Sequence, residues 1–326
     1  MLSEEVKNIK KNKVTYSFFK IISGSDLSKR RLPLMYIESP ASGPVIWLTA
    51  CMHGDELGGT VIIHEIFKKL KNKLLKGKVF AFPMMNPFGF ETSSRYIPIS
   101  NEDLNRLFPG NKNGTLGQRI AALIFDKITE TQPDLVLDLH NDWRKSIPYV
   151  VLDPPTVLAE NVLHEKINKY AFVSGLPVIM DTDELKGTLS ANLLDQSIPA
   201  LTLEMGESYV VNEKNIEYGI NVIWNLLSYL GMTSQAGEVF RYPLSNDFNT
   251  KILNYASHPW SSSSGIIRFL AKPGDIVKVN QPFARICNAF GKQQETLKVK
   301  KTSLVLGHND YSVAFPGTPV MAFGEL

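Results

Sequence analysis

A histidine and a glutamate stand three residues apart in the segment His53-Gly54-Asp55-Glu56. An imidazole and a carboxylate at this spacing, on a turn that enters a helix, can bind the same divalent cation, and zinc accepts both ligand types. The tetrapeptide alone is also typical of a surface turn, but a further imidazole, His140, follows another apolar segment. These residues make the two-histidine, one-glutamate set of many zinc hydrolases. We therefore predict a zinc site formed by His53, Glu56 and His140.

Two acidic positions extend this set. Glu204 ends a third apolar segment, where a carboxylate is costly unless it is paired or used. Beside a cation it can take a proton from water and later give it to a leaving group. Glu204 is our candidate for this role, with Glu207 as the nearby alternative. Asp138 or Asp142 could accept the second N–H of a histidine ligand, and we favour Asp138.

A long segment between these sites contains two arginines and an asparagine. Residues 86–114 are rich in Pro, Gly, Asn and Ser, and they include Arg95, Asn105 and Arg106. Loops of this length in compact domains tend to be functional or disordered. Arginine and asparagine side chains can hold a carboxylate and polarise a carbonyl group. The competing interpretation is that these residues form ordinary salt bridges within a loop. It is less favoured because His53, Glu56 and His140, which we call the metal set, are expected nearby.

The elements that must position these residues follow an alternating pattern. Short apolar runs, which predict strands buried on both faces, alternate with amphipathic segments, which predict helices. This alternation is typical of an α/β domain with a largely parallel sheet. In such domains, ligands bind at the carboxyl ends of the strands. The expected strands are 44–50, 78–85, 135–139, 149–153, 177–180 and 200–203. The expected helices are 58–75, 116–130, 159–173, 187–194 and 213–230.

The overall composition bounds the class of protein. The chain has 326 residues, of which 44% are hydrophobic and 21% charged, values that are typical of a folded protein of about two domains. Its net charge of +3 is too small to indicate a nucleic-acid or membrane partner. Two distant cysteines and the absence of an apolar leader lead us to expect a cytoplasmic protein. A homo-oligomer is left open.

The pattern changes after residue 231, and we place the domain boundary at 240, giving domains 1–240 and 241–326. Segments 264–286 and 302–323 have similar patterns of strands and Pro/Gly turns, which predicts two interlocked halves of a small all-β unit. The turn at 272–277 resembles that of biotinyl and lipoyl barrel-sandwich domains. The corresponding hairpin reads Val299-Lys300-Lys301-Thr302 and lacks the flanking methionines of a carrier. We therefore predict a structural or interaction domain.

Taken in order, these motifs resemble the succinylglutamate desuccinylase/aspartoacylase family, relatives of the zinc carboxypeptidases. The resemblance rests on HGDE at 53–56, NPFGF and SRY in the loop, DLNR at 103–106, DLH at 138–140 and Glu204. It implies a mixed, mainly parallel eight-stranded sheet flanked by helices, with a small all-β barrel-sandwich C-terminal domain. It also implies one Zn²⁺ per chain and a small N-acyl amino acid as substrate.

The resemblance assigns roles to individual residues as well. It implies that His53, Glu56 and His140 bind zinc, that Glu204 is the catalytic acid and base, and that Arg95 polarises the substrate carbonyl. It further implies that Asn105 and Arg106 hold a substrate carboxylate. Two alternatives are kept: a zinc carboxypeptidase acting on short peptides, and a non-catalytic protein that binds a carboxylate or metal.

Overall fold

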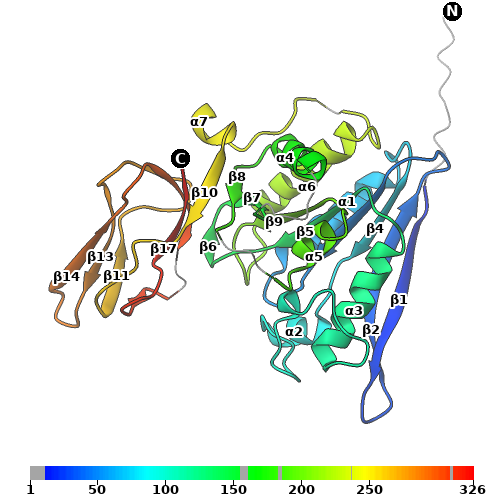
Figure 1. Cartoon of the computed structure of the whole chain (residues 1–326), viewed down its shortest axis with the longest axis horizontal. Coiled ribbons are helices and arrows are strands. Elements are labelled where there is room, and N and C mark those ends of the chain that lie inside the picture. The colour runs from blue at the N-terminus through cyan, green and yellow to red at the C-terminus, as the bar shows by residue number, and fades with distance from the viewer. Residues whose placement is uncertain (1–11, 155–160, 183–185, 236, 309–310) are drawn as a thin grey trace, which may run out of the picture.

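A computed structural model describes residues 12–154, 161–182, 186–235, 237–308 and 311–326. One mixed sheet runs through this part of the chain (Figure 1). Nine of its strands come from the first 240 residues: the short β6 (Lys145–Ser146), which pairs with β15 (Ser303–His308), and eight consecutive neighbours. The family resemblance implies a sheet of eight strands. In spatial order the eight neighbours are β1 (Val14–Ser23), β2 (Lys29–Glu38), β4 (Lys78–Phe82), β3 (Val45–Ala50), β5 (Leu135–His140), β9 (Ala200–Met205), β7 (Pro148–Leu152) and β8 (Val178–Met180).

The direction of the strands changes within this sheet. Strands β4, β3, β5 and β9 are parallel neighbours, so their carboxyl ends share one edge. Strand β7 then pairs antiparallel with β9, and β8 is parallel to β7. The ends of β7 and β8 therefore lie toward the opposite edge from the ends of β5 and β9.

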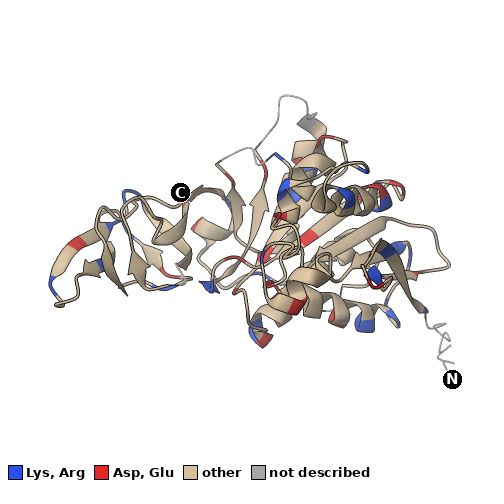
Figure 2. Cartoon of the chain, turned by 90° about the horizontal axis from the view of Figure 1, so that it is seen from below, with Lys and Arg blue, Asp and Glu red and all other residues tan. Residues whose placement is uncertain are grey.

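Helices cover both faces of the sheet (Figure 1). Helices α1 (Gly58–Leu70), α4 (Asn161–Ser174) and α6 (Glu213–Tyr229) pack together on one face, whereas α3 (Leu116–Thr129) and α5 (Leu189–Leu194) lie on the other. Their apolar sides contribute to a large core with the buried strands. In Figure 2 the charged positions follow the outer helices, and the central strands are mostly free of them. This is the amphipathic pattern on which the helix predictions depend.

Local sequence signals set several helix starts. Thr115 begins α3 with a capping box, in which its side chain and that of Gln118 satisfy each other's main-chain N–H groups. Thr188 and Asn212 cap α5 and α6 through their side chains. Such caps satisfy amides that the first helical turn leaves unpaired. In the loop expected at 86–114, Asn86 also caps the short helix α2 (Pro87–Thr92).

The N-terminal hairpin was missed by the sequence analysis. Strands β1 and β2 form a two-stranded antiparallel ribbon at the end of the sheet, and β2 pairs antiparallel with β4. Most of β1 is exposed or half-buried. Because the ribbon lies at a sheet edge, it lacks the continuous apolar run that identifies the buried strands.

The C-terminal region is a β sandwich whose two halves interlock. A second sheet contains β14 (Gln293–Lys298), β13 (Pro282–Cys287), β11 (Gly265–Phe269) and β16 (Val313–Ala314). The middle strand of each sequence repeat pairs with the first strand of the other repeat. Thus β12 (Ile276–Val277) pairs with β15 (Ser303–His308), and β16 pairs with β11. Apolar side chains from both sheets form their own core.

This region also continues the main sheet. Strand β10 (Ile252–Ala256) pairs parallel with β8 and antiparallel with β17 (Met321–Glu325). A third hydrophobic cluster joins residues from both sides of the predicted boundary, including Tyr149 and Leu253. The division at residue 240 stays a prediction, because the sheet and this cluster both cross it.

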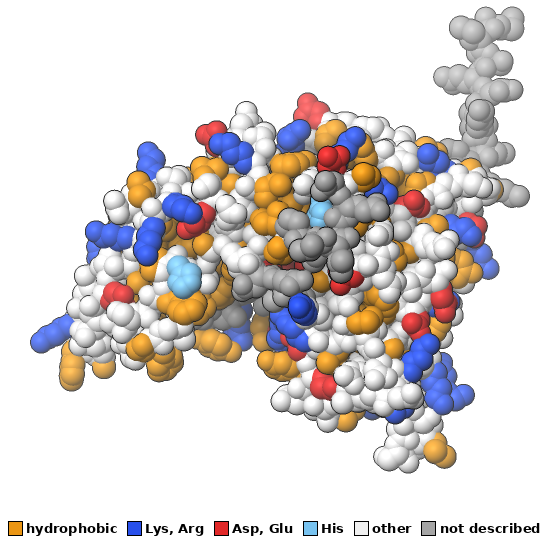
Figure 3. All heavy atoms as spheres, in the orientation of Figure 1, with side chains coloured by type: hydrophobic (Ala, Val, Ile, Leu, Met, Phe, Trp, Pro, Cys, Tyr) orange, Lys and Arg blue, Asp and Glu red, His pale blue; other side chains and the backbone are white. Residues whose placement is uncertain are grey.

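Two observations concern a possible membrane or protein partner. No helix in the described ranges has both the length and the apolar character needed to cross a membrane. Figure 3 shows hydrophobic side chains gathered along the lower edge of the C-terminal region. Exposed hydrophobic residues of this region include Ile266, Val313 and Phe315. The homo-oligomer considered above stays a prediction.

Candidate active site

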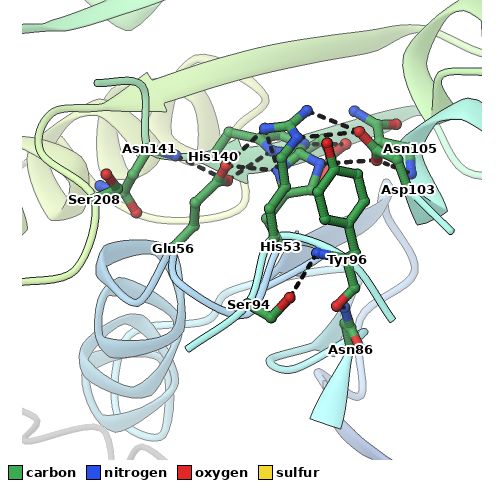
Figure 4. Close-up of polar contacts among 12 residues, drawn as sticks. His53, Glu56, Asn86, Ser94, Tyr96, Asp103, Asn105, His140, Asn141 and Ser208 are labelled. Carbon is green, nitrogen blue, oxygen red and sulfur yellow. Dashed lines mark hydrogen bonds and ion pairs between the residues drawn. The ribbon is translucent and has the colours of Figure 1, made fainter. Parts of the chain in front are cut away.

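His53, Glu56 and His140 converge at the carboxyl ends of neighbouring parallel strands. The chain leaves β3 through His53 and Glu56 before α1 begins, and β5 ends at His140. The Nδ1 atom of His53 lies 2.6 Å from Oε1 of Glu56, and the Nδ1 atom of His140 lies 2.9 Å from Oε2 of the same carboxylate. Figure 4 shows Glu56 directed between the two imidazole rings. The Nδ1 atoms of both histidines thus face a common point.

The chemistry of this set fits a zinc ion. One ligand atom from each of the three residues lies within 4.8 Å of the others, and the residues are only 2–4% exposed. Burial alone would raise the pKa of Glu56, but the two imidazoles outweigh it and hold that pKa well below its usual range. A buried carboxylate between two imidazoles is the donor set that zinc accepts at catalytic sites.

An aspartate behind His140 orients its ring. Nε2 of His140 lies 3.0 Å from Oδ2 of Asp138, and Thr49 donates a 2.6 Å hydrogen bond to the other oxygen of Asp138. The alternative residue, Asp142, instead accepts a 2.5 Å hydrogen bond from the Tyr149 hydroxyl. Asp138 is therefore the carboxylate that fixes the outer nitrogen of His140, as is usual behind histidine ligands.

A second aspartate does the same for His53, and the sequence analysis gave it no role. Oδ1 of Asp103 lies 3.1 Å from Nε2 of His53, and Oδ2 lies 3.0 Å from Nη2 of Arg95. Burial would raise the pKa of Asp103, but the hydrogen bond with His53 and the charge of Arg95 hold it below its usual range. Asp103 also caps the short helix η1 (Leu104–Arg106) through the main-chain amide of Asn105. In the sequence, the position of Asp103 in the DLNR motif was the only indication that it belongs to the site.

Close main-chain packing places Arg95 beside the metal set. The amide of Gly54 donates a 2.9 Å hydrogen bond to the carbonyl of Ser94. A Cβ atom on Gly54 would lie 1.9 Å from the carbonyl carbon of Gly89, so only glycine allows this approach. The Arg95 side chain consequently reaches within 3.8 Å of Oε1 of Glu56.

Asn141 holds the ends of three elements together. Its side-chain oxygen accepts a 3.1 Å hydrogen bond from the amide of Gly58, at the start of α1. Its side-chain nitrogen donates a 3.2 Å bond to the carbonyl of Gly206, just after β9. Its main-chain amide donates to Oε2 of Glu56 at 3.1 Å. The asparagine therefore links the segments that carry Glu56, His140 and Glu204.

Glu204 lies across from His140 in the pairing of β9 with β5. Its Oε2 atom is buried and has no hydrogen-bond partner among the described residues. Burial, reinforced by the nearby Asp142, raises its pKa well above the usual value. The alternative residue, Glu207, is held by hydrogen bonds of 3.2 and 2.6 Å from Asn212 and Asn215. Glu204 is thus the glutamate that faces the metal set.

One cavity of about 320 Å³ connects the candidate residues. All the predicted site residues line it except Asp138, which lies behind His140. Asn105 is fixed there because its Oδ1 atom accepts a 3.0 Å bond from the amide of Leu189, at the start of α5. The sequence analysis missed the rest of the wall. The missed lining residues include Tyr149, Asp153, Asp181, Ser190 and Tyr255.

Comparisons with known proteins identify relatives of this chain. Residues 42–230 match the model of the succinylglutamate desuccinylase/aspartoacylase catalytic domain. An N-alpha-acetyl-L-2,4-diaminobutyric acid deacetylase from Halomonas elongata is 26% identical over 256 residues, covering 75% of this chain and 70% of that protein.

Solved structures share the fold across nearly the whole chain. The product-bound ectoine utilization protein EutE (DoeB) from Ruegeria pomeroyi has a TM-score of 0.80 and 20% identity, covering 98% of this chain and 97% of that one. A succinylglutamate desuccinylase/aspartoacylase from Rhodobacter sphaeroides has the same score and identity, covering 97% and 96%. A metallo-carboxypeptidase from Burkholderia cenocepacia is more distant, with a TM-score of 0.54 and 15% identity over 69% and 66%.

Proposed function

The chain belongs to the succinylglutamate desuccinylase/aspartoacylase family, and on this premise we propose that it is a zinc-dependent hydrolase of the amide bond in N-acyl amino acids. The observation that carries the proposal is the position of Glu204, whose unpaired carboxylate oxygen shares a cavity with His53, Glu56 and His140. A metal-binding protein without catalysis has no need of such a group.

His53, Glu56 and His140 would hold the zinc ion. When bound, zinc supplies a Lewis acid that lowers the pKa of water and polarises a carbonyl oxygen. The protein contributes the rigid frame, since Asp103 and Asp138 fix the outer nitrogens of the two histidines. Fixed ligands bind a cation without losing further freedom of their side chains.

Glu204 would move the proton in this reaction. Its carboxylate accepts a proton from the attacking water and donates it to the departing amine, as a general base and then a general acid. A raised pKa suits both roles, because it brings the group closer to working pH. Glu204 also remains available, because no protein donor satisfies its Oε2 atom among the described residues.

The basic side of the cavity would orient the substrate. Arg95 stabilises the negative charge that develops on the carbonyl oxygen, and its pairing with Asp103 holds the guanidinium in place. Arg106 and Asn105 bind the carboxylate of the amino acid. Both line the cavity next to the metal set.

The experiment is a screen of N-acyl amino acids with zinc-loaded protein, in which the released amine is measured. Nα-acetyl-2,4-diaminobutyrate belongs in the first set, because the Halomonas relative is named for it. Short peptides are tested in parallel. Release of amino acids from peptide C-termini without deacylation would favour the carboxypeptidase alternative, and zinc binding without either activity would favour a binding protein.

A further inference from the structure

The segment that follows His140 is held by the C-terminal region. Residues 141–147 connect β5 to β7, and within this segment the short strand β6 pairs antiparallel with β15. The amide of Ile147 also donates a 2.9 Å hydrogen bond to the carbonyl of Leu306, in β15. A segment that begins directly after a proposed zinc ligand is therefore tied, at its far end, to a strand of the C-terminal region.

Trp143, in the middle of this segment, has a left-handed main chain. Its φ angle is 56°, a conformation that is strained for a residue other than glycine and persists only where the surroundings hold it. Two donors of Ser208 hold the Trp143 carbonyl, the amide at 2.9 Å and the hydroxyl at 3.0 Å. Strain of this kind is concentrated at functional sites, so the position of Trp143 calls for a functional explanation.

The indole ring of Trp143 rests on Gly307 of β15. A Cβ atom on Gly307 would lie 2.7 Å from Cδ1 and 2.9 Å from Cγ of the indole, which is too close for carbon atoms that are not bonded. Gly307 does not have the positive φ angle that favours glycine, so the approach of the ring explains why a side chain is not tolerated here. The indole also packs against the third hydrophobic cluster, which includes Leu306 and Ala322.

Arg144 forms a second link across the same junction. Its guanidinium carbon lies 4.4 Å from the centroid of the Tyr209 ring and 5.1 Å from that of the Tyr311 ring, distances at which a cation is attracted to an aromatic face. Tyr311 belongs to the C-terminal region. The amide of Tyr209 donates a 2.7 Å hydrogen bond to the carbonyl of Asp55, in the turn that carries part of the metal set. Arg144 thus connects the C-terminal region to that turn.

The near end of the segment carries groups of the site. The amide of Asp142 donates a 3.1 Å hydrogen bond to the carbonyl of Gly206, two residues after Glu204. The side chain of Asn141 bonds to the same carbonyl. Asn141, Asp142 and Glu204 all line the cavity. The main chain at Trp143 therefore sets the direction in which its two predecessors meet the end of β9.

We propose that Trp143 is a positioning residue through which the C-terminal region keeps His140 and Glu204 in their working arrangement. The inference rests on the proposed function, because its catalytic readout is the hydrolysis of an N-acyl amino acid. Displacement of the indole would turn the main chain at Trp143. That change would reach the site through the hydrogen bonds of Asn141 and Asp142.

Gly307→Ala tests this role. The added methyl group pushes against the indole, so we expect kcat and the affinity for Zn²⁺ each to fall by about tenfold, as when groups behind metal ligands are altered. KM should change less, because the groups that bind the substrate are untouched. Zinc affinity is measured by competition with a chromophoric chelator.

Gly324→Ala is the matched control. Its Cβ atom would lie 2.9 Å from the Cδ1 atoms of Ile179 and Leu253, so it overpacks the same sheet without meeting Trp143. The melting temperature should fall in both glycine variants, but kcat and zinc affinity of Gly324→Ala should stay within about twofold of the parent values. Equal losses of kcat and zinc affinity in the two variants would show a general effect of stability and overturn the proposal.

A double variant gives a second test. Trp143→Ala alone should lower kcat and zinc affinity, and it replaces Gly307→Ala if that variant does not fold. In the Trp143→Ala background the methyl group at position 307 no longer meets a ring, so Gly307→Ala should add less than about a twofold effect. The same loss with and without the indole would exclude the proposed role of Trp143.

Zinc affinity separates this proposal from the proposed function, because it requires no turnover. A loss of affinity in Gly307→Ala but not in Gly324→Ala supports the positioning role even if no amide is cleaved, in which case the proposed function fails alone. An active enzyme whose kcat and zinc affinity are unchanged in folded Gly307→Ala overturns the positioning role alone. A parent protein that binds no zinc overturns both.

Discussion

The amide of Gly54 donates a hydrogen bond directly to the carbonyl of Ser94, across 2.9 Å. This bond joins the turn that carries two of the proposed zinc ligands to the loop that carries Arg95. The two segments approach so closely that their side-chain positions depend on one another. The spacing of the motifs in the sequence gives no indication of this contact.

Gly54→Ala should therefore disturb the metal set and Arg95 together. The added methyl group would lie 1.9 Å from the carbonyl carbon of Gly89, and overpacking of this kind costs about 1–3 kcal/mol of stability. We expect a lower melting temperature and a clear loss of kcat/KM. Ser94→Ala is the control, because it keeps the main-chain carbonyl that accepts the bond. Equal activity in the two variants would contradict the argument.

Glu204→Gln should keep the metal and lose turnover. The amide cannot accept the proton, so kcat should fall by about 10²- to 10⁴-fold, whereas the three proposed ligands are untouched. Metal content by atomic absorption and kcat on the best N-acyl amino acid are measured on the same preparation. Glu207→Gln is the matched control, since Glu207 bonds to Asn212 and Asn215. Its kcat should stay near that of the parent protein.

Asp138→Asn should weaken zinc binding while the ligands remain. The amide is a poorer partner for the outer nitrogen of His140, and changes behind histidine ligands typically cost 10- to 100-fold in metal affinity, so we expect about that loss. Competition with a chromophoric chelator measures the affinity. Thr49→Val removes only the hydrogen bond to Asp138 and should have a smaller effect. An affinity unchanged in Asp138→Asn would exclude the orienting role.

Removal of zinc should lower thermal stability as well as activity. The ligand set is buried and contains an ionised glutamate, and a cation that binds only the folded state stabilises it by about 2.7 kcal/mol at one hundred times its dissociation constant. Dialysis against a chelator should lower the melting temperature, and added Zn²⁺ should restore it. In His53→Ala the zinc-dependent shift should disappear. A shift that persists in that variant would point to a different metal site.

The sequence predicts the parallel part of the site well. His53, His140 and Glu204 each follow an apolar run, and the parallel pairing of β3, β5 and β9 brings such ends to one edge. The apolar composition of each of these three segments is enough to predict that it forms a buried strand. Convergence then follows from a general rule about parallel sheets, without knowledge of the side-chain contacts.

The rest of the cavity depends on the direction of strands, which composition does not reveal. Asp153 and Asp181 also follow apolar runs, yet they line the same cavity from strands that run antiparallel to β9. Tyr255 reaches the cavity because β10 pairs with β8. The pairing of a strand with a partner far away in the chain leaves no local pattern.

The pairing of β10 with β8 also bears on how the protein avoids aggregation. Without residues 241–326, β8 would be the last strand of the sheet, and its apolar residues Val178 and Ile179 would lie beside unpaired main-chain groups. Such an open edge is a template for association with other chains. The interlocked C-terminal region thus covers an edge of the sheet that carries the site, and removal of residues 241–326 should expose this edge and lower the solubility of the protein.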